Sequence, residues 1–281
     1  MRSRLLAIAF LTGASLLGCK EEALTAAEAL AALEEVALSG QAETAASGTV
    51  EICTSFTIGQ AAEAAAAELE EFIATQLPCA EITLDGAALT VEYGVNPGNC
   101  TYHGQTYSGT HAIEIVSAAA GSLAVHHEWT DLANQTVSVS GGAEVTWSSA
   151  EGSRNVVHEL TWTRLADGWE VVGSGDRTQT ALDGDLLEGL AIEGARAWTS
   201  ERGDWELEID GVEMRWIDPV PQAGTYELTT PFEARNGEKK TATLSFARQD
   251  EDTIRVTIAS GDKSFAFDVT AEGAISQADG E

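Results

Sequence analysis

The feature that most constrains this chain is a period-two alternation of apolar and polar residues, which begins at Glu81 and recurs nearly to the C-terminus. In one run, Trp205, Leu207 and Ile209 alternate with acidic residues, as is typical of a strand buried on one face. Turn signals such as Asp-Gly and Asn-Gly separate the runs, and no helical pattern comes between them. We therefore expect a mainly β fold, an antiparallel meander of about twelve strands in a curved sheet or partial barrel, with a two-sheet β-sandwich as the alternative.

Two segments before the strands have helical character. Between Gln60 and Gln76 apolar residues recur at helical spacing, and Pro78 ends the run, so we expect an amphipathic helix over 60–76 that packs on the sheet. Residues 21–37 are rich in Ala and Glu with a weaker stripe, and Gly40 could end a helix there. A short helix and an extended tether are both compatible with this segment, and we interpret residues 41–49 as a linker.

The N-terminus has the pattern of a bacterial lipoprotein signal peptide. Arg2 and Arg4 precede an apolar run over residues 5–17, and Gly18 stands directly before Cys19. The run is too short to span a bilayer, so it predicts a processed export signal. We expect the mature chain to begin at an acylated Cys19 and to be held by the lipid bilayer. An ordinary secretory signal with a chance cysteine is the alternative.

This anchor sets the expected organisation and location. The predicted parts are a signal peptide at 1–18, a lipidated tether at 19–49, a single β-rich domain at 50–275 and a flexible tail at 276–281. Lys20 follows the cysteine where an aspartate would favour retention in the inner membrane, so the prediction is a cell-envelope protein of the outer membrane.

The charge of the chain disfavours two classes of partner. The chain has 15 basic and 45 acidic residues, and removal of residues 1–18 takes away Arg2 and Arg4, which leaves 13 − 45 = −32. So acidic a surface repels nucleic acid and anionic lipid headgroups alike, and no cluster of Lys and Arg offsets it. Solubility, or adaptation to a saline medium, accounts for this charge. The alternative is a cation-rich partner or bound divalent ions, and no local spacing of the acidic residues indicates either.

Three cysteines remain besides Cys19, and an exported protein meets an oxidising compartment. Three pairings are possible. We favour Cys79–Cys100, because these residues bracket a predicted hairpin over 81–93 and would staple its open end. Cys53 would then be buried and free.

A tryptophan repeat runs through the strand region. Each of three Trp-Thr pairs is followed by a glycine 13 positions after the tryptophan, and two copies carry a second tryptophan; the residues are Trp129, Trp162, Trp169, Trp198 and Trp205, with Gly142, Gly175 and Gly211. We interpret one unit as strand, polar turn, strand and glycine turn, and expect an aromatic ladder in the core. An exposed platform for glycans is the alternative.

Several segments resemble a group of uncharacterised bacterial lipoproteins, found in myxobacteria, that share a Cys, an aromatic-Gly strand end, a Gly-x-Cys and a Gly-rich turn. The matching segments are Pro78-Cys79-Ala80, residues 89–94, 98–102 and 104–109, and later Trp198-Thr199, Gly211-Val212-Glu213 and residues 219–224. The resemblance extends over residues 56–269. It implies an exported, β-rich lipoprotein and supports the Cys79–Cys100 pairing, and it supplies no catalytic residue.

Candidate chemical groups are few. His126-His127-Glu128 and His158-Glu159 have the residue types of a zinc site. On a strand, however, His126 and His127 point to opposite faces, so packed histidines without a metal are the prediction. We interpret the acidic segments at 183–185 and 250–252 as turns, and Ser174 between two glycines lacks the spacing of a nucleophile elbow. No phosphate-binding or dinucleotide motif predicts a cofactor.

These observations predict a non-enzymatic, membrane-anchored envelope lipoprotein with a structural role or a binding role toward an envelope protein or ligand. The first alternative is a carrier of a hydrophobic ligand in a cleft between sheet and helix. The second is an envelope hydrolase.

Overall fold

The structure is a computed structural model that describes residues 22–52, 60–102, 104–119, 121–148, 150–182, 185–215, 218–270 and 273–278. Two helices come first, α1 (Ala26–Ile52) and α2 (Ala62–Gln76). The strands that follow are β1 (Glu81–Asp85), β2 (Ala88–Tyr93), β3 (Thr101–Tyr102), β4 (Gln105–Thr106), β5 (Ser108–Ala119), β6 (Ser122–Ala133), β7 (Val137–Ser148), β8 (Ser153–Arg164), β9 (Glu170–Leu182), β10 (Asp185–Ser200), β11 (Gly203–Arg215), β12 (Asp218–Glu233), β13 (Lys239–Arg248), β14 (Thr253–Ser260), β15 (Lys263–Thr270) and β16 (Ile275–Gln277).

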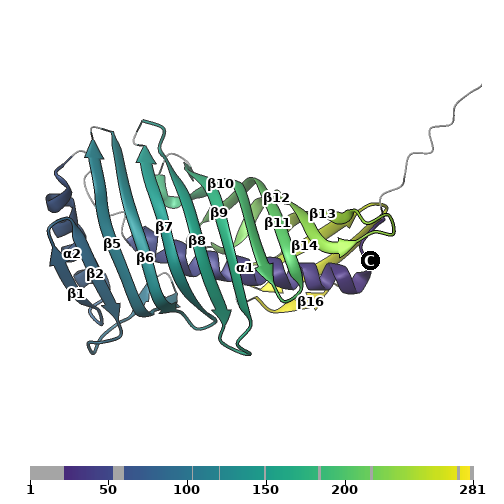
Figure 1. Ribbon diagram of the computed structural model, residues 1–281, viewed down its shortest axis with the longest axis horizontal. Helices are drawn as coiled ribbons and strands as arrows, with labels where there is room; N and C mark the ends of the chain where they lie inside the picture. Colours follow the sequence, from purple (N-terminus) through teal and green to yellow (C-terminus); the bar gives the residue numbers. More distant parts are fainter. Residues whose placement is uncertain are drawn as a thin grey trace, which may run out of the picture.

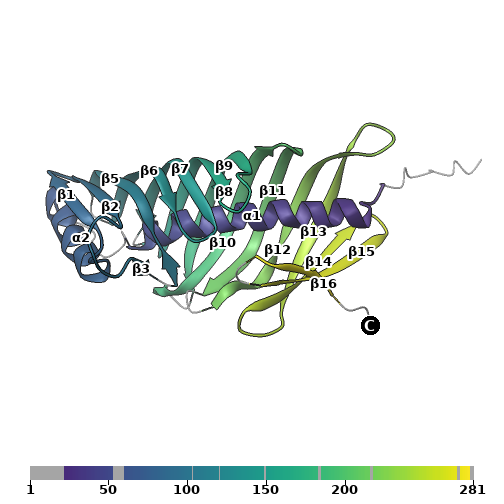
Figure 2. The same cartoon turned by 90° about the horizontal axis from the view of Figure 1, so that it is seen from below.

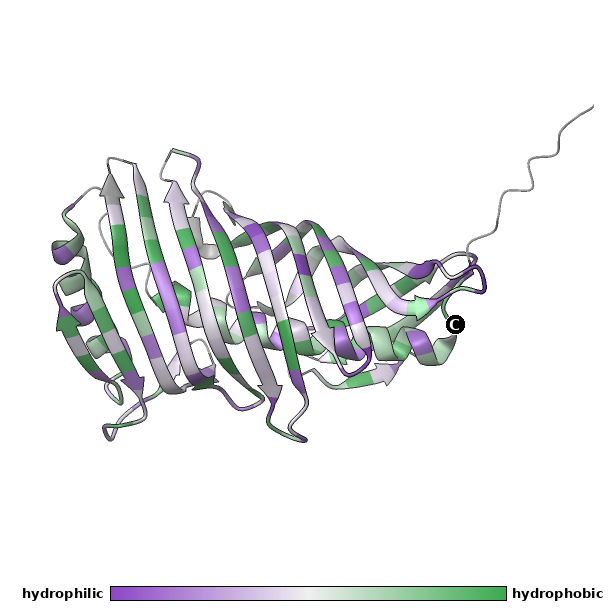
Figure 3. Cartoon of the chain, viewed as in Figure 1, coloured by the Kyte–Doolittle hydropathy of each residue, from purple (hydrophilic) through white to green (hydrophobic). Residues whose placement is uncertain are grey.

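Fourteen of these strands form one antiparallel sheet in the order β1-β2-β5 and then consecutively to β16, with β3 and β4 as a separate small pair. Strands that are neighbours in the chain are thus neighbours in the sheet, which confirms the mainly β meander. The alternation of hydropathy along individual strands is visible in Figure 3. Since the fourteen strands belong to a single sheet, the two-sheet sandwich is wrong.

The sheet curls around α1, which lies along the long axis of the molecule inside the curve (Figures 1 and 2). The two ends of the sheet, β1 and β16, do not pair with each other. Helix α2 covers one end of the sheet, where it contacts β1, β2 and β5. Both helices and the inward-facing side chains of the strands join in one hydrophobic core.

Helix α1 corrects the prediction for the residues before the domain. It continues without interruption through Gly40 and the predicted linker at 41–49, and fifteen of its 27 residues are buried. The β-rich domain therefore begins before residue 50, and the described part of the predicted tether is core. The physical reason is that a sheet that curls around a helix buries several of its faces, so no single apolar stripe is needed.

Helix α2 and the adjoining disulfide agree with the sequence. The predicted amphipathic helix over 60–76 is present, and its buried face consists of Ala65, Ala66, Leu69 and Ile73. The disulfide joins Cys79, just before β1, to Cys100, in the loop after β2. Cys53 lies outside the described residues.

The tryptophan repeat is a packing device. Its tryptophans at positions 129, 162, 198 and 205 are all buried. Trp198 and Trp205 are cross-strand partners on β10 and β11, and their rings stack with centroids 6.1 Å apart. The predicted glycine turns are wrong, because Gly142, Gly175 and Gly211 lie inside β7, β9 and β11. The predicted tail at 276–281 is also corrected in part, because β16 extends to Gln277.

Candidate functional site

Buried polar contacts join α1 to the concave face of the sheet along most of the helix, and we call them the polar seam. From the C-terminal to the N-terminal end of α1, the helix residues are Glu51, Glu43, Glu35 and Glu28, and their strand partners are Arg154, His158 and Arg177, then Trp198 and Ser200, then Lys240. The partner strand advances from β8 to β13 in the same direction. The seam therefore fixes both the position of α1 and its rotation within the sheet.

Glu43 is the centre of the seam. Its Oε1 lies 2.8 Å from Nε2 of His158, and its Oε2 forms an ion pair with Arg177. Burial by itself would raise the pKa of this carboxyl, but the positive charge of Arg177 and the contact with His158 outweigh it and lower the pKa to about 2. Glu43 is consequently charged at neutral pH, and it compensates the buried guanidinium of Arg177.

Two further arginines lie inside the sheet near this pair. Arg154, which is 1% exposed, contacts Glu51 at 3.4 Å and donates a hydrogen bond from Nε to Gln179. Arg196 is 5% exposed and stacks over the ring of Tyr226, and its Nε has no hydrogen-bond partner among the described residues. Such buried cations are costly unless they are paired, so the carboxylates of α1 are required for the sheet to close around them.

Glu35 differs from Glu43 because no cation lies equally close. Its carboxylate accepts hydrogen bonds from Nε1 of Trp198 at 3.2 Å and from Oγ of Ser200 at 2.9 Å, and Arg202 stands 3.7 Å away. Burial is the largest influence and raises the pKa of Glu35, although these contacts oppose it.

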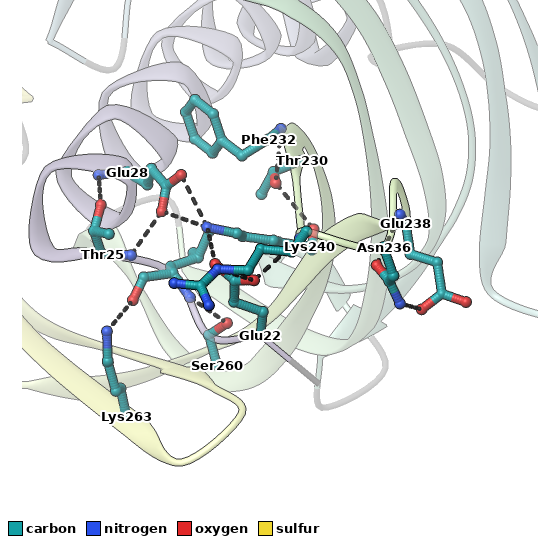
Figure 4. A network of polar contacts seen from close by, with 12 residues as sticks. Glu22, Thr25, Glu28, Thr230, Phe232, Asn236, Glu238, Lys240, Ser260 and Lys263 are labelled. Atoms are coloured by element: carbon teal, nitrogen blue, oxygen red, sulfur yellow. Dashed lines mark hydrogen bonds and ion pairs between the residues drawn. The ribbon is translucent and has the colours of Figure 1, made fainter. Parts of the chain in front are cut away.

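The first turn of α1 is fixed by a capping box and a lysine, as Figure 4 shows. Thr25 Oγ1 accepts the backbone N–H of Glu28, and the Glu28 carboxylate accepts the N–H of Thr25. Lys240 reaches both oxygens of Glu28 at 3.0 Å, and Lys263 donates to the carbonyl of Leu24. Although burial opposes the shift, the bonds from Thr25 and Lys240 together lower the pKa of Glu28.

The histidines lie as the alternation predicted. His127 is buried in a stack with His111 and Trp129, and the two imidazoles are joined by a 2.9 Å hydrogen bond. Burial lowers the pKa of His111 to about 3, so this ring is neutral. Within the described part of the chain, no three His, Cys, Asp or Glu side chains are grouped so as to hold a metal ion.

The remaining candidate segments serve packing or turns. Ser174 lies in the middle of β9 between glycines, and a Cβ on Gly175 would stand 2.3 Å from Cε1 of His158. The glycine thus makes room for a seam residue. Residues 250–252 form the exposed turn between β13 and β14, whereas the segment at 183–185 lies largely outside the described residues.

One cavity opens beside α1, with a volume of about 540 Å³. It lies between the helix, the turns at the ends of β7 and β8, and the residues that lead into β16. Its lining is mixed, with apolar contributions from Ala37, Leu38, Leu165, Ala166, Ala274 and Ile275 and polar ones from Glu34, Gln41 and Arg164. The carboxylate of Glu34 and the guanidinium of Arg164 are already paired, with Arg202 and Asp167 respectively.

The seam joins residues far apart in the chain and was not predicted from the sequence. A signal was nevertheless present, because Arg154, Arg177 and Arg196 occupy the inward positions of their strands. Glu35, Glu43 and Glu51 follow each other at steps of eight residues on the helix. Neither pattern identifies a partner without knowledge of the curl of the sheet.

Comparison with known proteins adds no relative: no family model, no curated protein and no solved structure matches this chain. Among the helices of the described part of the chain, none combines the length and apolar character that a membrane span requires. Cys19 lies outside the described residues.

Proposed function

We propose that this protein is a membrane-anchored envelope lipoprotein, held by an acylated Cys19, with a non-enzymatic structural or binding role. The observation that carries the proposal is the sequence Leu16-Leu17-Gly18-Cys19 behind a short apolar run. A single acyl chain binds a membrane only marginally, so stable attachment requires the two or three chains that bacterial lipoproteins carry.

The described fold is compatible with such an anchor. The chain enters the sheet almost at once after Cys19, since Ala23 and Leu24 are already buried. Three of the four seam carboxylates of α1, Glu35, Glu43 and Glu51, are buried as well. Buried charges of this kind suit a scaffold that binds a partner on its outer surface better than they suit a site for a dissolved substrate.

The test is a Cys19→Ser substitution in the native host, with Cys53→Ser as the matched control. We expect the Cys19 variant to lose incorporation of an alkyne-labelled fatty acid and to move from the membrane fraction to the soluble envelope fraction. The control should keep both. Membrane attachment that is unchanged in the Cys19 variant would contradict the proposal, and density-gradient separation of the two membranes tests the outer-membrane location.

A carrier of a hydrophobic ligand is the second candidate, because the cavity beside α1 has the volume of a small-molecule site. Native mass spectrometry of protein extracted from its host would detect a copurified ligand. A Leu38→Trp variant, which adds bulk to the lining, should lose that ligand. Unliganded protein from native membranes would count against a carrier.

A further inference from the structure

The cations of this acidic chain are distributed very unevenly. Between Lys20 and Arg154 the sequence contains neither Lys nor Arg. Helix α2 and the β1–β2 hairpin, residues 60–93, carry seven carboxylates and no cation; these are Glu63, Glu68, Glu70, Glu71, Glu81, Asp85 and Glu92. We call this end of the molecule the acidic pole.

The opposite end, where α1 begins (Figure 2), is also where the lysines after Lys20 occur, namely Lys239, Lys240 and Lys263. Figure 4 shows Lys240 and Lys263 beside the first turn of α1. We call it the end face and define it by residues 22–28, the β12–β13 turn with its flanking residues (234–240), and residues 261–263. Four cations oppose four carboxylates on it, namely Arg235, Lys239, Lys240 and Lys263 against Glu22, Glu28, Glu238 and Asp262. The side chain of Arg235 is 96% exposed and that of Lys239 is 43% exposed. Glu206 of β11 lies 3.8 Å from Lys239 and adds a carboxylate at the edge of this face. The charges of the end face are therefore nearly balanced, whereas those of the acidic pole are not.

The chain between Cys19 and the end face is very short. Leu24 is completely buried; its N–H donates to Oγ of Ser260 at 3.1 Å, and its carbonyl accepts from Nζ of Lys263. Three residue steps separate Cys19 from Glu22, and they span at most ~11 Å when fully extended. A lipid on Cys19 must consequently lie next to the end face.

We propose that the end face docks on the anionic phospholipid headgroups of the bilayer that holds Cys19, so that the acidic pole points away from the membrane. The proposal rests on the acylation proposed above. Anionic lipid repels the seven uncompensated carboxylates of the acidic pole more strongly than the nearly balanced charges of the end face, and this difference favours the same orientation as the short link to Cys19. Because α1 is roughly 40 Å long, the α2 pole stands well clear of the headgroups.

Trypsin tests this orientation on vesicles, because exposed cations are few. The chain 19–281, which contains every described residue, is prepared with Cys53→Ser, so that Cys19 is the only cysteine outside the disulfide. It also carries Lys20→Gln, so that trypsin cannot separate the body from the coupled Cys19. It is coupled through Cys19 to a maleimide lipid in vesicles of phosphatidylethanolamine and phosphatidylglycerol. Cleavage after Arg235 reports on the end face. Cleavage after Arg248, at the exposed β13–β14 turn, is the internal control, since β13 places it roughly 30 Å from Lys239.

Coupling to these vesicles should slow the cut after Arg235 severalfold relative to the cut after Arg248. A Lys263→Gln variant should regain cleavage at Arg235, and a Gln249→Glu variant, which lowers the net charge by the same one unit at the distant turn, should not. Each variant is normalised to its rate without vesicles, so a change in its folding does not enter the ratio. An unchanged ratio, or selective protection of Arg248, would overturn the docking.

The coupling chemistry replaces the natural acylation. Failure of the Cys19→Ser experiment in cells would therefore refute the natural anchor alone, and failure of the trypsin experiment would refute the docked orientation alone.

Discussion

The two helices of this protein are held by different physics. Helix α2 lies on one end of the sheet with a single apolar face, and its amphipathic pattern was readable in the sequence. Helix α1 lies inside the curve of the sheet, buried on several faces, and its contacts with the strands include four carboxylates. The comparison teaches that apolar periodicity identifies a helix that covers a sheet and misses a helix that a sheet encloses.

The contacts of the two helices also differ in how they contribute to the stability of the fold. Burial of Leu69 and Ile73 stabilises α2 without a geometric requirement beyond close packing. In the seam, by contrast, each charge must find its partner, because a buried ion without one costs several kcal/mol. The seam is therefore better suited to select one position of α1 than to add stability.

The largest effect should follow from breaking the centre of the seam. Glu43→Gln leaves the buried guanidinium of Arg177 without its counter-charge, and we expect the free energy of unfolding to fall by about 3–5 kcal/mol. Urea unfolding followed by circular dichroism measures the change. Glu34→Gln is the matched control, since the Glu34–Arg202 pair is about one-third exposed and should contribute at most about 1 kcal/mol. Equal losses of unfolding free energy in the two variants would show that a buried seam carboxylate contributes no more than a partly exposed one.

The Glu43–Arg177 ion pair also predicts how the free energy of unfolding changes at acidic pH. The pKa of Glu43 is depressed in the folded state to about 2, from 4.5 as its ordinary value. Its contribution is thus complete above pH 4.5 and is lost as the pH falls toward 2. The difference between the wild-type protein and Glu43→Gln should shrink over this window.

A slightly smaller effect is expected for α2. Leu69→Ala removes a side chain that is 1% exposed, and the cavity should cost about 2–5 kcal/mol. Unlike the loss in Glu43→Gln, this loss should not shrink as the pH falls from 4.5 toward 2, because no titrating group is removed. The exposed neighbour Glu71 supplies the control, in which Glu71→Ala should change stability by under about 0.5 kcal/mol. A pH-dependent Leu69→Ala effect would contradict the division between the two helices.

The cap of α1 should contribute less. Thr25→Ala removes the hydroxyl that accepts the N–H of Glu28, and a lost N-cap costs about 1 kcal/mol. Thr44, an exposed threonine in the middle of the same helix, provides the comparison, and Thr44→Ala should be nearly silent in thermal unfolding. A Thr25 variant as stable as the Thr44 variant would mean that Lys240 and Lys263 hold the helix end alone.

The smallest effect is expected at Glu35, with a pH dependence of opposite sign. Its pKa is raised, so its stabilising contribution is present below pH 4.5 and is lost as the pH rises through the folded-state value. Glu35→Gln should therefore lose stability relative to the wild-type protein at pH 4, and less or none at pH 7. Unfolding measured at both pH values gives the sign, and a larger loss at pH 7 would contradict it.

Much of the fold followed from local patterns. Alternation predicted the meander, spacing predicted α2, and the position of two cysteines around a hairpin predicted the disulfide. The inward orientation of His127 and of the tryptophans followed from the same alternation. The predictions were wrong where one sequence pattern can have two different physical causes. The small residues of α1 indicated a linker, yet they are small because the curved sheet approaches the helix closely, as at Gly48, where Tyr107 leaves no room for a Cβ.

By itself, the sequence determined that the chain is a β meander with an acidic surface and with neither Lys nor Arg between Lys20 and Arg154, since these depend on residues near one another in the chain. The pairing of Glu43 with Arg177, more than a hundred residues apart, was decided only by the tertiary structure. So were the contacts of Lys240 and Lys263 with the start of α1. The physical reason is that the curl of a sheet is a collective property of many strands, and only that curl brings these charges to the helix.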